Sequence, residues 1–71
     1  MTLAEQFGRN VSTERHRIGI SQEALAKASG MERDSVQKIE TGHRSVRLLT
    51  LLKLADALGV DPCKLLEGLR P

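Results

Sequence analysis

The segment from Ser21 to Gly42 constrains the fold of this 71-residue chain more than any other. It has the pattern of two short helices joined by a tight turn at residues 29–31, with a stop signal at Gly42. Ser21 can cap the first helix, because its hydroxyl accepts a hydrogen bond from a free backbone N–H group. Gly30 and Gly42 suit the left-handed conformation in which helices commonly end. Helices this short are unstable alone in water, so the pair is predicted to dock on other helices.

A longer helix is predicted before this pair, over residues 3–17. Thr2 and Glu5 stand three positions apart, which is the spacing of a capping box at a helix start. One face of the helix carries apolar residues at four-residue spacing, namely Leu3, Phe7 and Val11. The next position on that face is Arg15, and an arginine among apolar residues needs a charged partner. Glu40, near the end of the second short helix, is the candidate partner.

Two more helices are predicted after the pair. Residues 48–58 carry leucine and alanine at helical spacing, and Asp61-Pro62 is a typical helix start, in which a capping carboxylate precedes proline. Strand-type alternation is absent, so the expected fold is all-α, a compact five-helix bundle in a single domain over residues 1–71. Beyond the first helix, the residues expected to face the core are Ala24, Leu25, Ala28, Val36, Ile39, Leu48, Leu51, Leu52, Leu54, Ala55, Leu58, Leu65, Leu66 and Leu69.

Composition excludes several classes of protein. No apolar run is long enough to cross a membrane, and the N-terminus lacks the hydrophobic region of a signal peptide. The single cysteine, Cys63, cannot form an internal disulfide, which fits a protein of the reducing cytoplasm. The net charge of +2 is mildly basic and supports a nucleic-acid partner only weakly.

Neither a catalytic nor a metal-binding pattern is present in the sequence. The two histidines and Cys63 lack zinc-ligand spacing, and no Ser/His/Asp or Cys/His arrangement or phosphate-binding glycine loop is found. The sequence therefore predicts no enzyme activity, no metal, no cofactor and no small-molecule ligand. Cys63 lies near a helix start, so two outcomes are open: a thiol pKa lowered by the helix dipole, or an ordinary exposed or half-buried cysteine.

Several segments resemble the Cro/repressor-type (xenobiotic-response-element) helix-turn-helix family. They are Ser21-Gln22-Glu23, Leu25-Ala26, Gly30, Ile39-Glu40 and Gly42, followed by Leu51-Leu52-Lys53-Leu54-Ala55, Leu58-Gly59-Val60 and Leu65-Leu66, which are similar to the family's fourth and fifth helices. The resemblance extends from about Phe7 to Leu66. It implies a protein that binds double-stranded DNA and places its second short helix in the major groove. It also implies the same ion pair between Arg15 and Glu40.

The chain departs from the family pattern at four positions, which are Glu32, Val46, Arg47 and Leu49. Glu32 and Arg47 stand where the family has capping hydroxyl residues, so the helices that follow them are expected to have weaker starts. Val46 replaces a common proline. Leu49 stands where the family more often has a polar residue, so it is expected to be half exposed or to lie at an interface.

The resemblance implies which residues read DNA bases. Carried over position by position, the base-reading places fall on Glu32, Arg33, Asp34 and Lys38, and Gln37 is added because it points the same way. Arginine and lysine can donate to guanine N7 and O6, and a carboxylate can accept from cytosine N4. An ordinary solvated helix face is the alternative for this set, most of all for the two carboxylates.

A second set is predicted to contact DNA phosphates. These residues surround the start of the first short helix and the loop after the second, namely Gln22, Ser35, Thr41, His43, Arg44 and Arg47, with Arg17 as a weaker candidate. Arg44 and Arg47 are the strongest electrostatic anchors, because their charge acts without exact geometry. For the basic residues of the loop, a role in solubility alone is the competing interpretation.

The resemblance further implies a homodimer on an inverted repeat, with half-sites about one helical turn apart. Its dimer contacts fall on Val60, Cys63, Leu66 and Leu69. The expected function is transcriptional repression or activation for a phage, a plasmid or a restriction–modification operon. Two alternatives stay open: an antitoxin-like or other protein-binding module, favoured by Leu49, Glu32 and Asp34, and a helical scaffold with no role at DNA.

Overall fold

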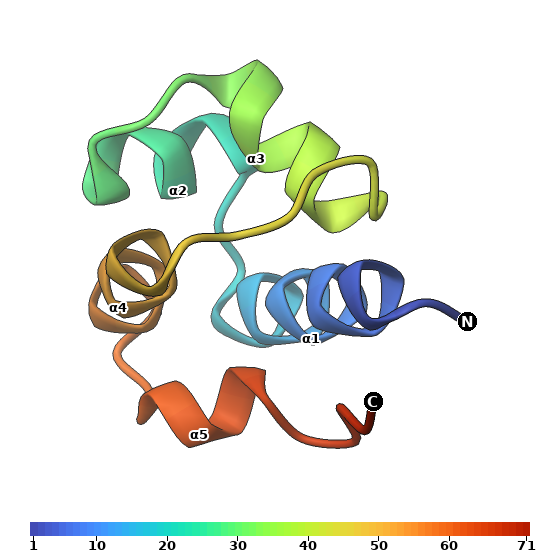
Figure 1. Ribbon diagram of the computed structural model, residues 1–71. Coiled ribbons are helices and arrows are strands. Elements are labelled where there is room, and N and C mark those ends of the chain that lie inside the picture. Colours follow the sequence, from blue (N-terminus) through green and yellow to red (C-terminus); the bar gives the residue numbers. More distant parts are fainter.

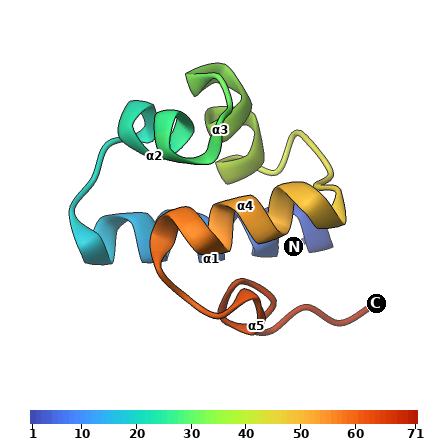
Figure 2. The same cartoon turned by 90° about the vertical axis from the view of Figure 1, so that its left-hand side faces the viewer.

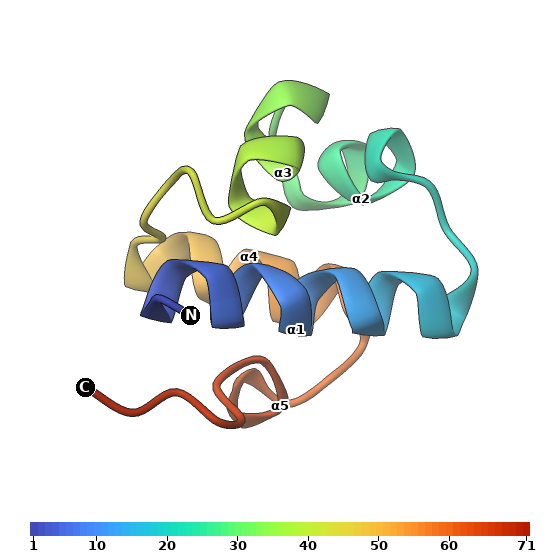
Figure 3. The ribbon, with the colours of Figure 1, turned by 90° about the vertical axis from the view of Figure 1, so that its right-hand side faces the viewer.

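The computed structural model describes all residues from 1 to 71 and contains five helices and no strands. In chain order they are α1 (Leu3–Ile18), α2 (Gln22–Ser29), α3 (Arg33–Glu40), α4 (Leu48–Leu58) and α5 (Pro62–Leu65). Helices α1 and α4 lie in the middle of the molecule, with α2 and α3 on one side of them and α5 on the other (Figures 1, 2 and 3). None of the five helices is long and apolar enough to cross a membrane.

The helix ends follow the local signals in the sequence closely. The capping box at α1 is present, because Thr2 N donates to Glu5 Oε1 at 2.8 Å and Glu5 N donates to Thr2 Oγ1 at 3.1 Å. The Ser21 hydroxyl accepts from Ala24 N at 3.0 Å at the start of α2. Helices α3 and α4 begin without a side-chain cap, as predicted from Glu32 and Arg47.

One apolar core joins all five helices. It contains eleven buried residues, which are Phe7, Val11, Leu25, Ala26, Val36, Ile39, Leu51, Leu54, Ala55, Leu58 and Leu65. Helices α2 and α3 each contribute two of these residues. The helix pair therefore packs on α1 and α4, in addition to the contacts between α2 and α3 themselves. This packing gives short helices the stability that they lack in isolation.

Six predictions of core positions were wrong, because a helix can carry apolar residues on sides that face no other helix. Leu48, Leu52 and Leu66 are 72%, 44% and 43% exposed, because only the side of α4 with Leu51, Leu54, Ala55 and Leu58 meets other helices and α5 ends at Leu65. Ala24 and Ala28 are also exposed. In their place α2 buries Ala26 and Ser29, whose hydroxyl donates to Leu25 O at 2.7 Å and is therefore satisfied in the core. Leu3, predicted on the apolar face of the first helix, is 46% exposed as well.

Helix α1 approaches the end of α3 very closely at Gly8. A Cβ atom at this position would lie 2.2 Å from Ile39 O and 2.7 Å from Glu40 O. Both contacts are with backbone, so only glycine lets the two helices come this close. The crossing brings α3 to the position that the ion pair with α1 requires.

Candidate nucleic-acid interface

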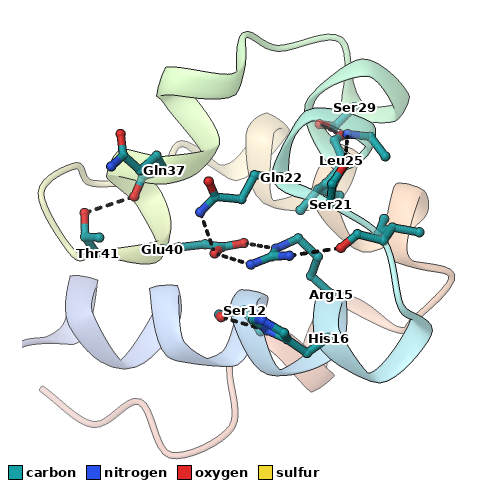
Figure 4. A network of polar contacts seen from close by, with 12 residues as sticks. Ser12, Arg15, His16, Ser21, Gln22, Leu25, Ser29, Gln37, Glu40 and Thr41 are labelled. Atoms are coloured by element: carbon teal, nitrogen blue, oxygen red, sulfur yellow. Dashed lines mark hydrogen bonds and ion pairs between the residues drawn. The ribbon is translucent and has the colours of Figure 1, made fainter.

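A buried ion pair fixes the helix pair onto α1 (Figure 4). Arg15 Nε lies 2.6 Å from Glu40 Oε2, and Arg15 Nη2 donates to Glu40 Oε1 at 3.0 Å. The two side chains are only 11% and 5% exposed. A third N–H of the guanidinium, at Nη1, donates to Ile20 O at 2.9 Å. The predicted pair is therefore present as a two-pronged contact, the geometry in which arginine binds a carboxylate most strongly.

The hydrogen bond to Glu40 raises the pKa of Arg15 further above its usual value, against the opposing effect of burial. The guanidinium therefore stays charged whenever the protein is folded. Because the two charges are paired and joined by two hydrogen bonds, the ion pair holds α1 and α3 in a fixed relative position.

Gln22, the first residue of α2, joins the same network. Its Nε2 atom donates to Glu40 Oε1 at 3.1 Å, so one carboxylate receives hydrogen bonds from both α1 and α2 (Figure 4). An amide nitrogen carries two hydrogens, which leaves the second for another acceptor. The residue predicted to contact a phosphate is thus held in place by the core ion pair.

Helix α3 exposes the whole set of residues predicted to read bases. Its Val36 and Ile39 are buried, whereas the members of that set are exposed, namely Glu32, Arg33, Asp34, Gln37 and Lys38. The helix lies on the outer side of the molecule with α2 beside it (Figure 1). The fold brings these side chains together on one accessible surface, which a helix needs in order to enter a DNA groove.

Residues predicted to contact phosphates surround the end of α3, and several already have partners in the protein. Arg44 Nη1 donates to Ser35 Oγ at 3.0 Å, which holds the arginine against α3. The Thr41 hydroxyl donates to Gln37 O at 2.9 Å and lies 2.8 Å from His43 Nδ1. Arg47 is exposed at the start of α4.

Arg17 stands apart from this group. It lies in the last turn of α1, where its Nε donates to Glu14 Oε1 at 2.7 Å. The structure gives Arg17 no contact with the loop after α3, so it is the least supported member of the predicted phosphate set.

The four residues predicted for the dimer interface lie at and beyond the loop before α5. Cys63 and Leu66 are exposed, and Val60 and Leu69 are half-buried against the core. Of the two outcomes left open for Cys63, the structure supports the ordinary exposed cysteine and not a lowered thiol pKa. Hydrogen bonding and charge from the neighbouring Asp61 carboxylate raise the pKa of Cys63, because a negative neighbour disfavours the thiolate.

Replacing Asp61 with asparagine is expected to lower the pKa of Cys63 and to speed its alkylation by iodoacetamide. Asparagine is as good a helix cap as aspartate, so α5 keeps its start while the negative charge is lost. The measurement is the alkylation rate at about pH 8, just below the ordinary thiol pKa. Glu67→Gln is the control, since it removes an equal charge from the same segment. Equal rates for wild type and Asp61→Asn would contradict the explanation.

Sequence reasoning missed two residues that position the site. The sequence does not reveal the role of Gly8, because a glycine within a helical pattern does not show which other helix packs against it. Asn10 reads as an ordinary solvent-facing polar residue, yet its side chain binds residues more than fifty positions away. The structure contains no cluster of three or more His, Cys, Asp or Glu side chains that could hold a metal ion.

Comparison with known proteins agrees with this arrangement. The family described as "Helix-turn-helix" matches residues 14–65. Control protein C.SmaI of Serratia marcescens is 39% identical over 72 residues, an alignment that covers 99% of this chain and 86% of that protein. The crystal structure of the restriction-modification controller protein C.AhdI from Aeromonas hydrophila superposes with a TM-score of 0.86 at 42% identity, and covers 87% of this chain and 94% of that one.

A further solved structure, the clp gene regulator ClgR from C. glutamicum, has a TM-score of 0.89 at 26% identity, over 93% of this chain and 86% of that one. The matched region takes in the end of α1, the helix pair, α4 and α5. The sequence pattern, the ion-paired helix pair and these relatives agree, and the chain belongs to the Cro/repressor-type helix-turn-helix family.

Proposed function

We propose that this protein is a transcriptional regulator that binds specific sequences in double-stranded DNA by placing α3 in the major groove. The observation that carries the proposal is the exposed face of α3, on which Arg33, Asp34, Gln37 and Lys38 are all accessible while Val36 and Ile39 anchor the helix. A bare helix of eight residues could not hold these side chains in register. The ion pair and the core packing make the surface rigid before DNA arrives.

Base reading follows from the chemistry of that face. Arg33 can donate two hydrogen bonds to guanine N7 and O6, and Lys38 can donate to the same edge. Asp34 can accept from cytosine N4, and Gln37 can pair with adenine N6 and N7. Glu32 precedes the helix and serves mainly to reject bases that offer an acceptor.

Phosphate contacts would fix the position of α3 in the groove. Arg44 and Arg47 supply charge after α3, while Gln22 and the free N–H groups at the start of α2 can bind a phosphate on the other side. Ser35, Thr41 and His43 add hydrogen bonds close to Arg44. Because Ser35 holds Arg44 in place, less conformational freedom is lost when the arginine meets a phosphate.

The relatives suggest a biological setting. C.AhdI is a restriction-modification controller protein, and C.SmaI is named a control protein. We place this chain in the same class, as a regulator of a restriction–modification operon.

Action as a homodimer completes the proposal. One helix of this length reads only a few base pairs, and a second copy raises affinity by acting at high effective concentration. The surface for the second copy comprises Val60, Cys63, Leu66 and Leu69, of which Cys63 and Leu66 are exposed and Val60 and Leu69 half-buried. Exposed Leu48 and Leu52 of α4 would extend it.

A second candidate function rests on the first turn of α4. Leu48 and Leu49 are 72% and 62% exposed, which is unusual for two adjacent leucines in a helix. Such a surface would suit a protein partner, as in an antitoxin-like module with secondary DNA binding. A regulator whose α4 leucines contact a protein partner remains compatible with DNA binding through α3.

Replacement of Arg33 by alanine is expected to relax base preference at one position of each half-site and to leave the others unchanged. A good bidentate contact discriminates by about 1–3 kcal/mol, so the preferred base at that position should lose roughly tenfold or more of its advantage. Competition binding with duplexes that vary each position in turn measures the effect.

Replacement of Arg44 by alanine is expected to act differently. Binding should weaken for all sequences alike, and the slope of log affinity against log salt should fall by about one. Arg9→Ala is the control, because it removes an equal charge from an exposed position of α1 that belongs neither to the α3 surface nor to the residues proposed for the dimer. Helix α5 lies on the opposite side of the molecule from α3 (Figure 1). If Arg33→Ala and Arg44→Ala both bind like wild type, docking through α3 is wrong.

A further inference from the structure

Helix α5 is a single turn of four residues, too short to be stable without help from the rest of the fold. Only one of its side chains is firmly held by packing, since Leu65 is fully buried. Leu66 is 43% exposed and Leu69 is half-buried. These two leucines line an open pocket of about 200 Å³ beside Phe7 and Leu51 rather than a filled core. Apolar contact therefore leaves residues 66–69 weakly positioned.

The side chain of Asn10 supplies the missing restraint. Its Nδ2 atom donates to Leu65 O at 2.9 Å and to Glu67 O at 2.8 Å. Its Oδ1 atom accepts from Gln6 Nε2 at 3.0 Å, which orients the amide so that both donors face the chain after α5. Leu65 is the last residue of α5, where a helix leaves its carbonyl groups without internal partners, and Glu67 follows the helix by two residues.

The two bound carbonyls bracket a two-residue segment, Leu66 and Glu67. Because both ends of this segment are held by the same amide, the backbone that carries the Leu66 side chain is restrained. Leu66 is one of the exposed apolar residues proposed to meet a second copy. A surface held in its bound conformation in advance loses less entropy on association.

We infer that Asn10 is a positioning residue for the dimer, which holds α5 and Leu66 in the orientation that a second copy of the chain contacts. This inference rests on the homodimer proposed above. It gives a residue of α1, a helix outside the DNA-reading pair, an influence on the strength of the dimer through its hydrogen bonds to residues 65 and 67.

The test compares wild type with Asn10→Asp and with Thr13→Ala, an exposed position of the same helix, as the control. Aspartate keeps the shape of the side chain but removes both donors and turns a carboxylate towards two carbonyls. Sedimentation equilibrium without DNA is expected to show a dimer dissociation constant raised about tenfold or more in Asn10→Asp and unchanged in Thr13→Ala. Amide hydrogen exchange should accelerate at Leu66 and Leu69 and stay unchanged through α2 and α3, which a general loss of stability would not produce.

The outcomes are separable. If wild type dimerises and Asn10→Asp dimerises equally well, the positioning role is overturned while the dimer stands. If wild type remains monomeric up to millimolar concentration, both the dimer and this inference are overturned, whereas DNA reading by α3 is unaffected. If Asn10→Asp does not fold, Asn10→Ala gives the same comparison without the added charge, and Gln6→Ala is expected to show a smaller effect in the same direction.

Discussion

The Gly8→Ala protein is expected to be much less stable than wild type, although alanine is the better helix former. In an exposed helix this substitution would add about 0.5–1 kcal/mol of stability. Here the new Cβ would stand 2.2 Å from Ile39 O and 2.8 Å from Glu40 C, both backbone atoms of α3. Helix α3 would have to move away from α1, and that movement would also stretch the ion pair.

Thermal unfolding followed by circular dichroism measures the effect. Overpacking in a core costs about 1–3 kcal/mol and sometimes more. In a domain of this size each kcal/mol lowers Tm by about 4–8 °C, so a fall of roughly 4–24 °C is expected. Thr13→Ala, which changes helix propensity at an exposed position of α1, should shift Tm little. A Gly8→Ala protein as stable as wild type would mean that the two helices do not cross this closely.

The second large effect is expected when Arg15 is replaced by methionine. Methionine has a similar length, so packing is largely kept, but the Glu40 carboxylate stays 5% exposed with only Gln22 as a partner. Breaking a buried pair in this way costs about 3–5 kcal/mol, because an uncompensated charge remains in the core. For a small domain this loss approaches the whole free energy of unfolding.

The double variant Arg15→Met with Glu40→Met separates the cost of the stranded charge from that of lost packing. Replacing both partners with apolar residues of similar size is often nearly neutral, so the double variant should regain most of the stability that the single variant loses. Urea unfolding of wild type, both single variants and the double variant gives the four free energies of unfolding that a double-mutant cycle needs. A single variant within about 1 kcal/mol of wild type would show that water reaches the pair, as at an exposed salt bridge.

The sequence predicted the helices well because caps and breakers act locally. The capping box at Thr2 and Glu5, the cap at Ser21 and the left-handed backbone at Gly30 depend only on neighbouring residues. The ion pair was predictable for a related reason. An arginine on the apolar face of a helix has to find a carboxylate, and Glu40 was the acidic residue on the apolar side of another helix.

Features that depend on contacts between distant segments could not be predicted in this way. Which leucines of α4 are exposed depends on where its neighbours stop, so Leu48 and Leu52 were assigned to the core wrongly. The Asn10 side chain donates hydrogen bonds to Leu65 O and Glu67 O, which lie 55 and 57 positions further along the chain. No local sequence pattern indicates these contacts. Of the two outcomes open for Cys63, a lowered pKa is not found, because a single-turn helix has a weak dipole, whereas the Asp61 carboxylate is an adjacent full charge.

Sequence reading by α3 is best tested by selecting bound duplexes from random DNA with the purified wild-type protein, at about 150 mM salt. A dimer that reads DNA with α3 should select a two-fold symmetric consensus with half-sites about one helical turn apart. The consensus should carry a guanine at the position where Arg33→Ala loses its base preference. Absence of enrichment, or enrichment that disappears with a modest rise in salt, would contradict sequence reading by α3. The exposed leucines of α4 would then become the surface to test with a protein partner.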